Sequence, residues 1–202
     1  MFYDRTDALL DALNRILVDK FGKLKVQLRN TENSYEKSEL IENLYEELYD
    51  IAVNSYLSLA QGVYSDEIGI NPLKRAKRPD LKWIDKILST PDPVSKYIFD
   101  AELDRRAARL FEAVSISSTP DADIDAAMRS MALSYAIYAV RVTDDAAVKA
   151  MKDSGVKKVR WVAEDDTHTC KVCHKRDDTV YPIDDIPPKP HINCRCWLVR
   201  VP

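Results

Sequence analysis

All four cysteines of this 202-residue chain lie in one segment near its C-terminal end, CKVCHKRDDTVYPIDDIPPKPHINCRC. They form a C-x-x-C pair followed by H-x-x-C-x-C. Zinc takes four ligands in a tetrahedron, from cysteine sulfur and histidine nitrogen, and two such pairs can supply them. A segment with so little apolar material also needs a link of this kind to hold one fold. The candidate ligands of one structural zinc ion are Cys170, Cys173, His191, Cys194 and Cys196.

These five residues compete for four positions, and His168 and His174 lie nearby, so the ligand set stays open at this stage. One or two disulfides, or four reduced thiols in a core, are the alternatives to a metal. The N-terminal residues resemble no secretory signal, and clustered cysteines in a reducing cytosol favour a metal.

A catalytic role for the cluster is the less favoured interpretation. A cysteine with a histidine can act as a thiol nucleophile, but neighbouring cysteines favour chelation. The sequence contains neither H-E-x-x-H nor the H-x-E of zinc deaminases. Glu164, Asp165 and Asp166, just before the cluster, are interpreted as a solvated or bracing acidic patch. We therefore expect no enzyme activity and a structural metal.

Helical periodicity dominates the N-terminal part of the chain. Apolar residues three and four positions apart predict an amphipathic helix over residues 6–29. Asn33, with Glu36 three residues later, predicts the start of a second helix that ends near Gly62. A short connection favours antiparallel neighbours, so these two helices are expected to form a hairpin. Residues 63–79, with the basic stretch 74–78, are predicted to be a loop or the joint between two domains.

The rest of the chain divides into shorter helices and a small β element. Asp80, Asp92-Pro93 and Thr119-Pro120 are predicted to start helices, and Thr143 is predicted to start a separate short helix that Gly155 ends. Alternating β-branched and aromatic residues predict a strand at 157–163, with two further candidates in TVYPI and CWLVRV.

The fold class expected from these patterns is mainly α with a small C-terminal β element (α+β). It is a helical body followed by a zinc-knuckle-like Cys/His cluster. We expect an N-terminal helical region over residues 1–90. A second region, 91–202, has a helical lead-in and a metal-binding β element at 156–202. The net charge of −3 argues against a nucleic-acid coat, and no apolar run reaches 18 residues, so we expect no membrane contact.

The C-terminal segment combines a tryptophan-containing strand, an aspartate, C-x-x-C, a proline-rich stretch and H-x-N-C-R-C, formed by Trp161, Asp166, Cys170, Cys173, Pro187, Pro188, His191, Asn193, Cys194, Arg195 and Cys196. In these features it resembles the phage Mu protein F-like family, the minor head or head-morphogenesis proteins of tailed bacteriophages. The turn after C-x-x-C, RDDT, lacks the glycine that is frequent there in the family.

What the resemblance implies is a structural, low-copy component of the virion head near the portal vertex, supporting head morphogenesis or DNA delivery. Its partners would be the portal protein, the major capsid protein or both. It would be present in the host bacterial cytoplasm during assembly. The hairpin within residues 1–90 would then be a docking surface, unless it only forms the core of the body. The alternative is a nucleic-acid-binding zinc module in weak contact with packaged phage DNA, supported by a mildly basic C-terminal part and the stretch 74–78.

Overall fold

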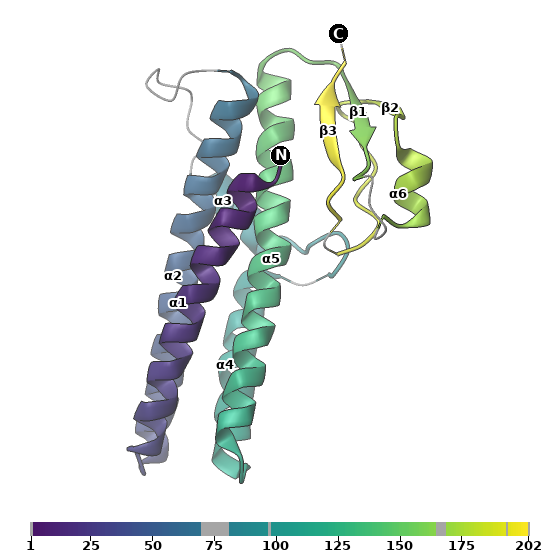
Figure 1. Cartoon of the computed structure of the whole chain (residues 1–202). Helices are drawn as coiled ribbons and strands as arrows, with labels where there is room; N and C mark the ends of the chain where they lie inside the picture. Colours follow the sequence, from purple (N-terminus) through teal and green to yellow (C-terminus); the bar gives the residue numbers. More distant parts are fainter. Residues whose placement is uncertain (1, 70–80, 97, 165–168, 193, 202) are drawn as a thin grey trace.

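The computed structural model is an elongated helical bundle with a small sheet beside one end (Figure 1). It describes residues 2–69, 81–96, 98–164, 169–192 and 194–201. The helices are α1 (Asp4–Arg29), α2 (Ser34–Glu67), α3 (Leu81–Ser89), α4 (Phe99–Ile116), α5 (Pro120–Asp153) and α6 (Lys171–Arg176), and the strands are β1 (Lys158–Val162), β2 (Val180–Pro182) and β3 (Trp197–Arg200). The expected fold class, mainly α with a small C-terminal β element, is confirmed.

Helix α5 is the centre of the molecule, because α1, α2 and α4 all pack along it. The aromatic ring of Phe99, at the start of α4, lies among Tyr56 of α2 and Tyr135 and Tyr138 of α5. The Tyr135 hydroxyl donates to the carbonyl of Leu48 at 2.8 Å, and the Tyr56 hydroxyl donates to the carbonyl of Tyr135 at 3.2 Å. These buried polar groups find backbone partners on the opposite helix, so they hold α2 and α5 in register.

Several predicted helix ends are confirmed. The Asn33 side chain accepts hydrogen bonds from the backbone N–H groups of Tyr35 and Glu36, at 2.8 and 3.4 Å, and so caps α2. Pro120 is the first residue of α5, where its missing N–H costs nothing. Gly155 has a φ of +81° just beyond the end of α5, a conformation that suits glycine.

The predicted end of the second helix near Gly62 is wrong. Helix α2 continues to Glu67, because Val63 and Tyr64 are buried in the bundle and their packing outweighs the weak propensity of one glycine. Gly62 has a use here: a side chain at this position would lie 3.1 Å from the guanidinium of Arg5.

Two further helix starts are also wrong. Thr143 starts no new helix, since α5 runs through it; its hydroxyl is buried, donates to the Ala139 carbonyl at 2.9 Å and contacts the Thr6 hydroxyl at 2.7 Å. Asp92 accepts from Val94 N–H at 3.0 Å but closes only one turn. Lys96 then takes a φ of +62°, and α4 begins at Phe99, which is buried.

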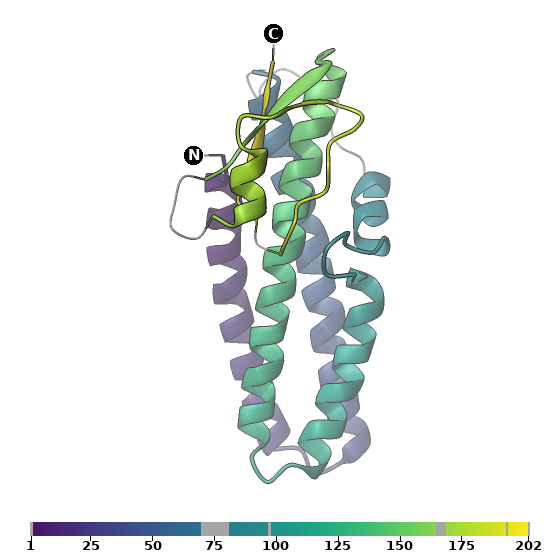
Figure 2. The same cartoon turned by 90° about the vertical axis from the view of Figure 1, so that its right-hand side faces the viewer.

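The three predicted strands form one antiparallel sheet in the order β2-β1-β3. In the central strand, Val159 and Trp161 are buried whereas Lys158 and Arg160 are exposed, as the alternation predicts. Seen from the side, the extended chain after β2 runs along α5 (Figure 2). The basic stretch 74–78 and Asp80, Asp165, Asp166, His168 and Asn193 lie outside the described residues. No helix in the described part has both the length and the apolarity to cross a bilayer.

Candidate metal centre

The first half of the Cys/His cluster sits at the start of α6. Cys170 is the N-cap of this helix, and its sulfur accepts a hydrogen bond from the backbone N–H of Cys173 at 3.4 Å. Cys173, one turn later, is buried. The C-x-x-C pair therefore forms a helical turn that presents two sulfurs on the same side.

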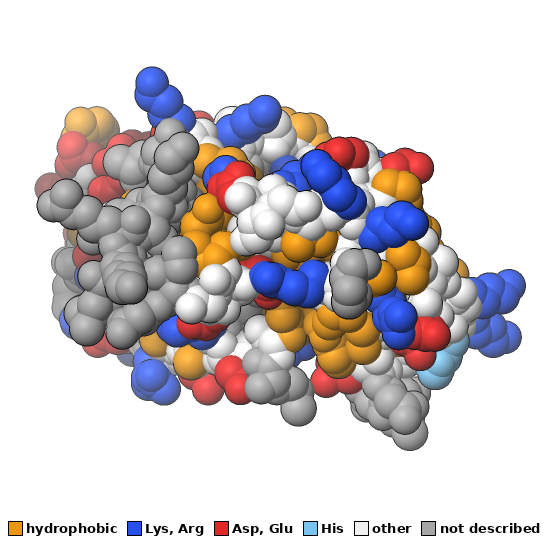
Figure 3. Space-filling view, turned by 90° about the horizontal axis from the view of Figure 1, so that it is seen from above, with side chains coloured by type: hydrophobic (Ala, Val, Ile, Leu, Met, Phe, Trp, Pro, Cys, Tyr) orange, Lys and Arg blue, Asp and Glu red, His pale blue; other side chains and the backbone are white. Residues whose placement is uncertain are grey.

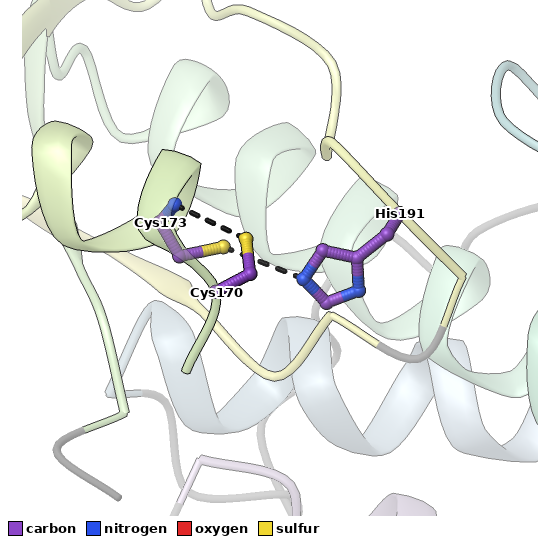
Figure 4. A group of neighbouring side chains, drawn as sticks. All are labelled: Cys170, Cys173 and His191. Carbon is purple, nitrogen blue, oxygen red and sulfur yellow. Dashed lines mark hydrogen bonds between the residues drawn. The ribbon is translucent and has the colours of Figure 1, made fainter. Parts of the chain in front are cut away.

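The second half comes from the chain that leads into β3. His191 Nε2 and Cys194 Sγ each lie 3.6 Å from Cys173 Sγ. Figure 4 shows the sulfurs of Cys170 and Cys173 next to each other, with the imidazole of His191 directed toward them. The ligand atoms of Cys170, Cys173 and His191 lie within 4.8 Å of one another, and so do those of Cys173, Cys194 and Cys196. The structure thus brings all five candidates around the sulfur of Cys173, while His174 is exposed on α6.

These spacings fit a zinc ion. With Zn–S bonds of about 2.3 Å, two sulfurs on a tetrahedron lie about 3.8 Å apart, close to the spacing found here. The imidazole of His191 is also oriented to bind a metal ion. Its Nδ1 lies 2.9 Å from the carbonyl oxygen of Ile192, which can only accept, so Nδ1 carries the proton and Nε2 offers its lone pair.

The protonation of the thiols also fits a metal site. Contacts from Cys194, Cys173 and the Trp161 indole lower the pKa of Cys196 to about 5. Burial raises the pKa of Cys173 to about 12, and the hydrogen bond with Cys196 raises the pKa of Cys194. Trp161 Nε1 is buried without an oxygen or nitrogen partner among the described residues, so its N–H suits a thiolate. A bound cation would displace the remaining thiol protons.

The cluster is attached to the bundle through Tyr3 and Lys189. The buried Tyr3 hydroxyl donates to Asp144 Oδ1 on α5 at 2.7 Å and lies 3.0 Å from the Cys196 carbonyl oxygen. The Lys189 ammonium lies 2.6 Å from Asp144 Oδ2, donates to the Cys194 carbonyl at 3.0 Å and contacts the Tyr3 hydroxyl. One polar network therefore joins the backbone of two candidate ligands to α5 and to the residue preceding α1.

Arg195 adds a second link between the cluster and α1. Its guanidinium forms a bidentate pair with the Asp7 carboxylate, at 2.8 and 2.7 Å, and lies over the Tyr3 ring at 4.4 Å from the centroid. The neighbouring Glu164 is 4.0 Å from the same guanidinium. Glu164 is therefore the one residue of the predicted acidic patch whose contact with the cluster the described residues show.

Sequence reasoning missed Tyr3, Asp7 and Asp144 as partners of the cluster. Lys189 and Arg195 lie inside the motif, in PPKP and NCRC, but their partners are far away in the chain. The motif therefore draws attention only to the cation of each ion pair. Asp144 and Asp7, the acidic partners, are each one carboxylate among many on an amphipathic helix.

Comparison with known proteins agrees with this site. Residues 113–199 match a family model described as Phage Mu protein F like protein. The matched stretch begins within α4 and covers α5, the sheet up to Val199 and all five candidate ligands. Over these residues the chain is similar to that family, in agreement with the resemblance found in the sequence. Neither the curated proteins nor the solved structures gave a match.

Proposed function

We propose that this chain is a structural minor head protein of a tailed phage, a low-copy component near the portal vertex that supports head morphogenesis or DNA delivery. The observation that carries the proposal is the overlap between the family match and the docked cluster. Residues 113–199 include both the candidate metal ligands and α5, the helix to which the cluster is fixed. The cluster acts as a staple between the sheet and the bundle.

The metal in this proposal is one structural zinc ion. Protein atoms alone can fill four positions, so no ligand place is left for a reactive water. Cys173, Cys194 and Cys196 are buried. In this proposal the chain is not an enzyme, and the zinc ion stabilises the fold and takes part in no reaction.

The proposed partners are the portal protein, the major capsid protein or both. The inner faces of α1 and α2 are used within the bundle, because residues such as Leu17 and Leu48 are fully buried. A docking surface on this hairpin would therefore use its outer face. Val18 and Val26 are 61% and 56% exposed there, and both lie on α1.

Among the described residues, which leave out the basic stretch 74–78, the charge distribution gives the DNA-binding alternative little support. Seen from above, lysine and arginine side chains are interspersed with acidic and apolar ones (Figure 3). Several cations of the C-terminal part are already paired, as in Lys152–Asp184, Arg160–Asp178 and Arg200–Glu67. Counterion release from DNA requires cations that are available to phosphates.

The test is to quantify the protein in purified virions of the phage that encodes it, by mass spectrometry with labelled reference peptides. We expect a few copies per head, co-purifying with the portal protein when the two are co-expressed. Absence from the virion, or a copy number like that of the major capsid protein, would overturn the proposal. Native mass spectrometry tests the metal separately: one zinc per chain is expected, lost on chelation.

A further inference from the structure

A cavity of about 410 Å³ lies between α5 and the extended chain that follows β2, next to the metal cluster. Its size falls within the range of about 300–1,000 Å³ typical of ligand sites. The walls are largely aliphatic, with Ile137, Val140 and Val148 from α5 facing Ile183 and Ile186 from the extended segment. Such walls favour an apolar group.

Most charged groups that line this cavity already have a partner within the protein. Lys189 pairs with Asp144 at 2.6 Å, and Lys152 pairs with Asp184 at 2.7 Å. Asp92 accepts two backbone hydrogen bonds, from Val94 at 3.0 Å and Ser95 at 2.6 Å. These carboxylates and ammonium groups have no unmet demand for a ligand.

Asp145 differs from the other lining carboxylates. In the described part of the chain its one ion pair is with Arg141, at 4.0 Å, and its side chain is 48% exposed. The guanidinium of Arg141 also donates to the carbonyl and the hydroxyl of Thr90, at 3.0 and 2.8 Å, and is held at the 4.0 Å limit of an ion pair with Asp145. Asp145 therefore offers carboxylate oxygens to a ligand that enters the cavity.

The charge and the lining together select the ligand. A neutral apolar group would cover Asp145 without giving it a partner, and this is unfavourable for a carboxylate. An anion would meet a net negative charge, because four carboxylates and three lysine or arginine side chains line the cavity. A cation on an aliphatic stem satisfies both requirements, because its methylene groups contact the walls while its charge reaches Asp145.

We propose that this cavity is a docking site for a partner protein, and that it takes an apolar segment whose lysine or arginine pairs with Asp145. The inference rests on the proposed function, since the partner would be another protein of the phage head. It adds to that function the chemistry of the contact and its place, on the face of α5 beside the cluster. Because Lys189 and Cys194 also line the cavity, an ordered metal cluster keeps this wall in place.

A stability cost accompanies Asp145. Burial, together with the nearby Asp144 and Asp92 carboxylates, raises the pKa of Asp145 to about 6. At neutral pH the folded chain therefore holds an ionised carboxylate in a place that disfavours the charge. Residues that weaken the fold in this way are frequent in binding sites.

The experiment uses the full zinc-loaded chain and three blocked tripeptides, Ac-Leu-Lys-Leu-NH2 and its versions with norleucine or glutamate in the middle. Methyl NMR titrations follow Ile137, Val148 and Ile186. The lysine peptide should bind roughly tenfold more tightly than the norleucine peptide, and the glutamate peptide more weakly still. Asp145→Asn should remove the preference for lysine. Asp184→Asn, which removes a paired carboxylate at the same cavity, is the matched control and should keep it.

Equal binding of the three peptides, shifts away from these methyl groups, or an unchanged preference in Asp145→Asn would overturn the inference. Incorporation into virions separates it from the proposed function. If the wild-type chain enters heads and Asp145→Asn enters equally well, the docking site is refuted and the head function stands. If the wild-type chain is absent from heads, the proposed function fails whatever the peptides do. Reduced incorporation of Asp145→Asn alone, with a stable fold, supports the inference.

Discussion

Replacing Lys189 by methionine should destabilise the folded chain strongly, because Lys189 neutralises a largely buried carboxylate. The side chains of Lys189 and Asp144 are only 20% and 22% exposed. Methionine keeps the length of the stem but removes the ammonium group, which also serves the Cys194 carbonyl and the Tyr3 hydroxyl. Removing one partner of a fully buried ion pair costs about 3–5 kcal/mol, and partial exposure lowers this to about 2–3 kcal/mol here.

The assay is urea unfolding of the zinc-saturated protein, followed by circular dichroism of the helices. Lys152→Met is the control, since it breaks a pair with Asp184, whose side chain is 84% exposed, and should leave the midpoint almost unchanged. The double variant Asp144→Asn/Lys189→Met should recover most of the loss, because no uncompensated charge remains. Equal effects of Lys189→Met and Lys152→Met, or no recovery in the double variant, would refute the reasoning.

Four further outcomes are expected. Asp145→Asn should stabilise the chain at pH 7 by about 1 kcal/mol, a value reduced because the side chain is partly exposed. The pKa of Asp145 is about 6 in the folded chain against an ordinary value of 3.8, so the stability of the wild type should fall relative to the variant as the pH rises from 4 to 6. Gly22→Ala should stabilise α1 by about 0.5–1 kcal/mol in thermal unfolding, because an added methyl group contacts nothing within 4 Å. Asn33→Ala should cost about 1 kcal/mol in the same measurement through loss of the α2 cap. Cys173→Ser should abolish zinc retention in native mass spectrometry, whereas His174→Ala should still retain one ion.

The sequence predicts helices and strands of this fold well where a signal within a few residues determines the secondary structure. The apolar stripe of α1, the Asn33 cap and the alternation around Trp161 each act over a few residues, and the structure has each of them. The five candidate ligands are also local, because zinc sites are built from short spacings. Their gathering around Cys173 follows from two such motifs facing each other.

Local signals fail where burial competes with them. Gly62 and Thr143 are weak helix residues, yet both lie inside helices, because their neighbours fill the core of the bundle. Asp92 forms its turn as expected, but the chain leaves it at Lys96, and Phe99 then enters the aromatic core. The docking of the cluster on the bundle cannot be predicted from local sequence for a different reason. Tyr3 and Asp7 contact residues that lie 193 and 188 positions further along the chain.

The contact between Tyr3 and Cys196 also sets an order of events during synthesis. Its two residues are 193 positions apart, so it cannot form until nearly the whole chain has been translated. At about 5–20 residues per second, the first helix waits roughly 10–40 s for this partner. Over that interval α1 can pair with α2, which follows it directly, and later with α5. The ring of Tyr3 meets Arg195 and the Cys196 carbonyl only after that segment has been made, so docking of the cluster comes later than the pairing of α1 with α2.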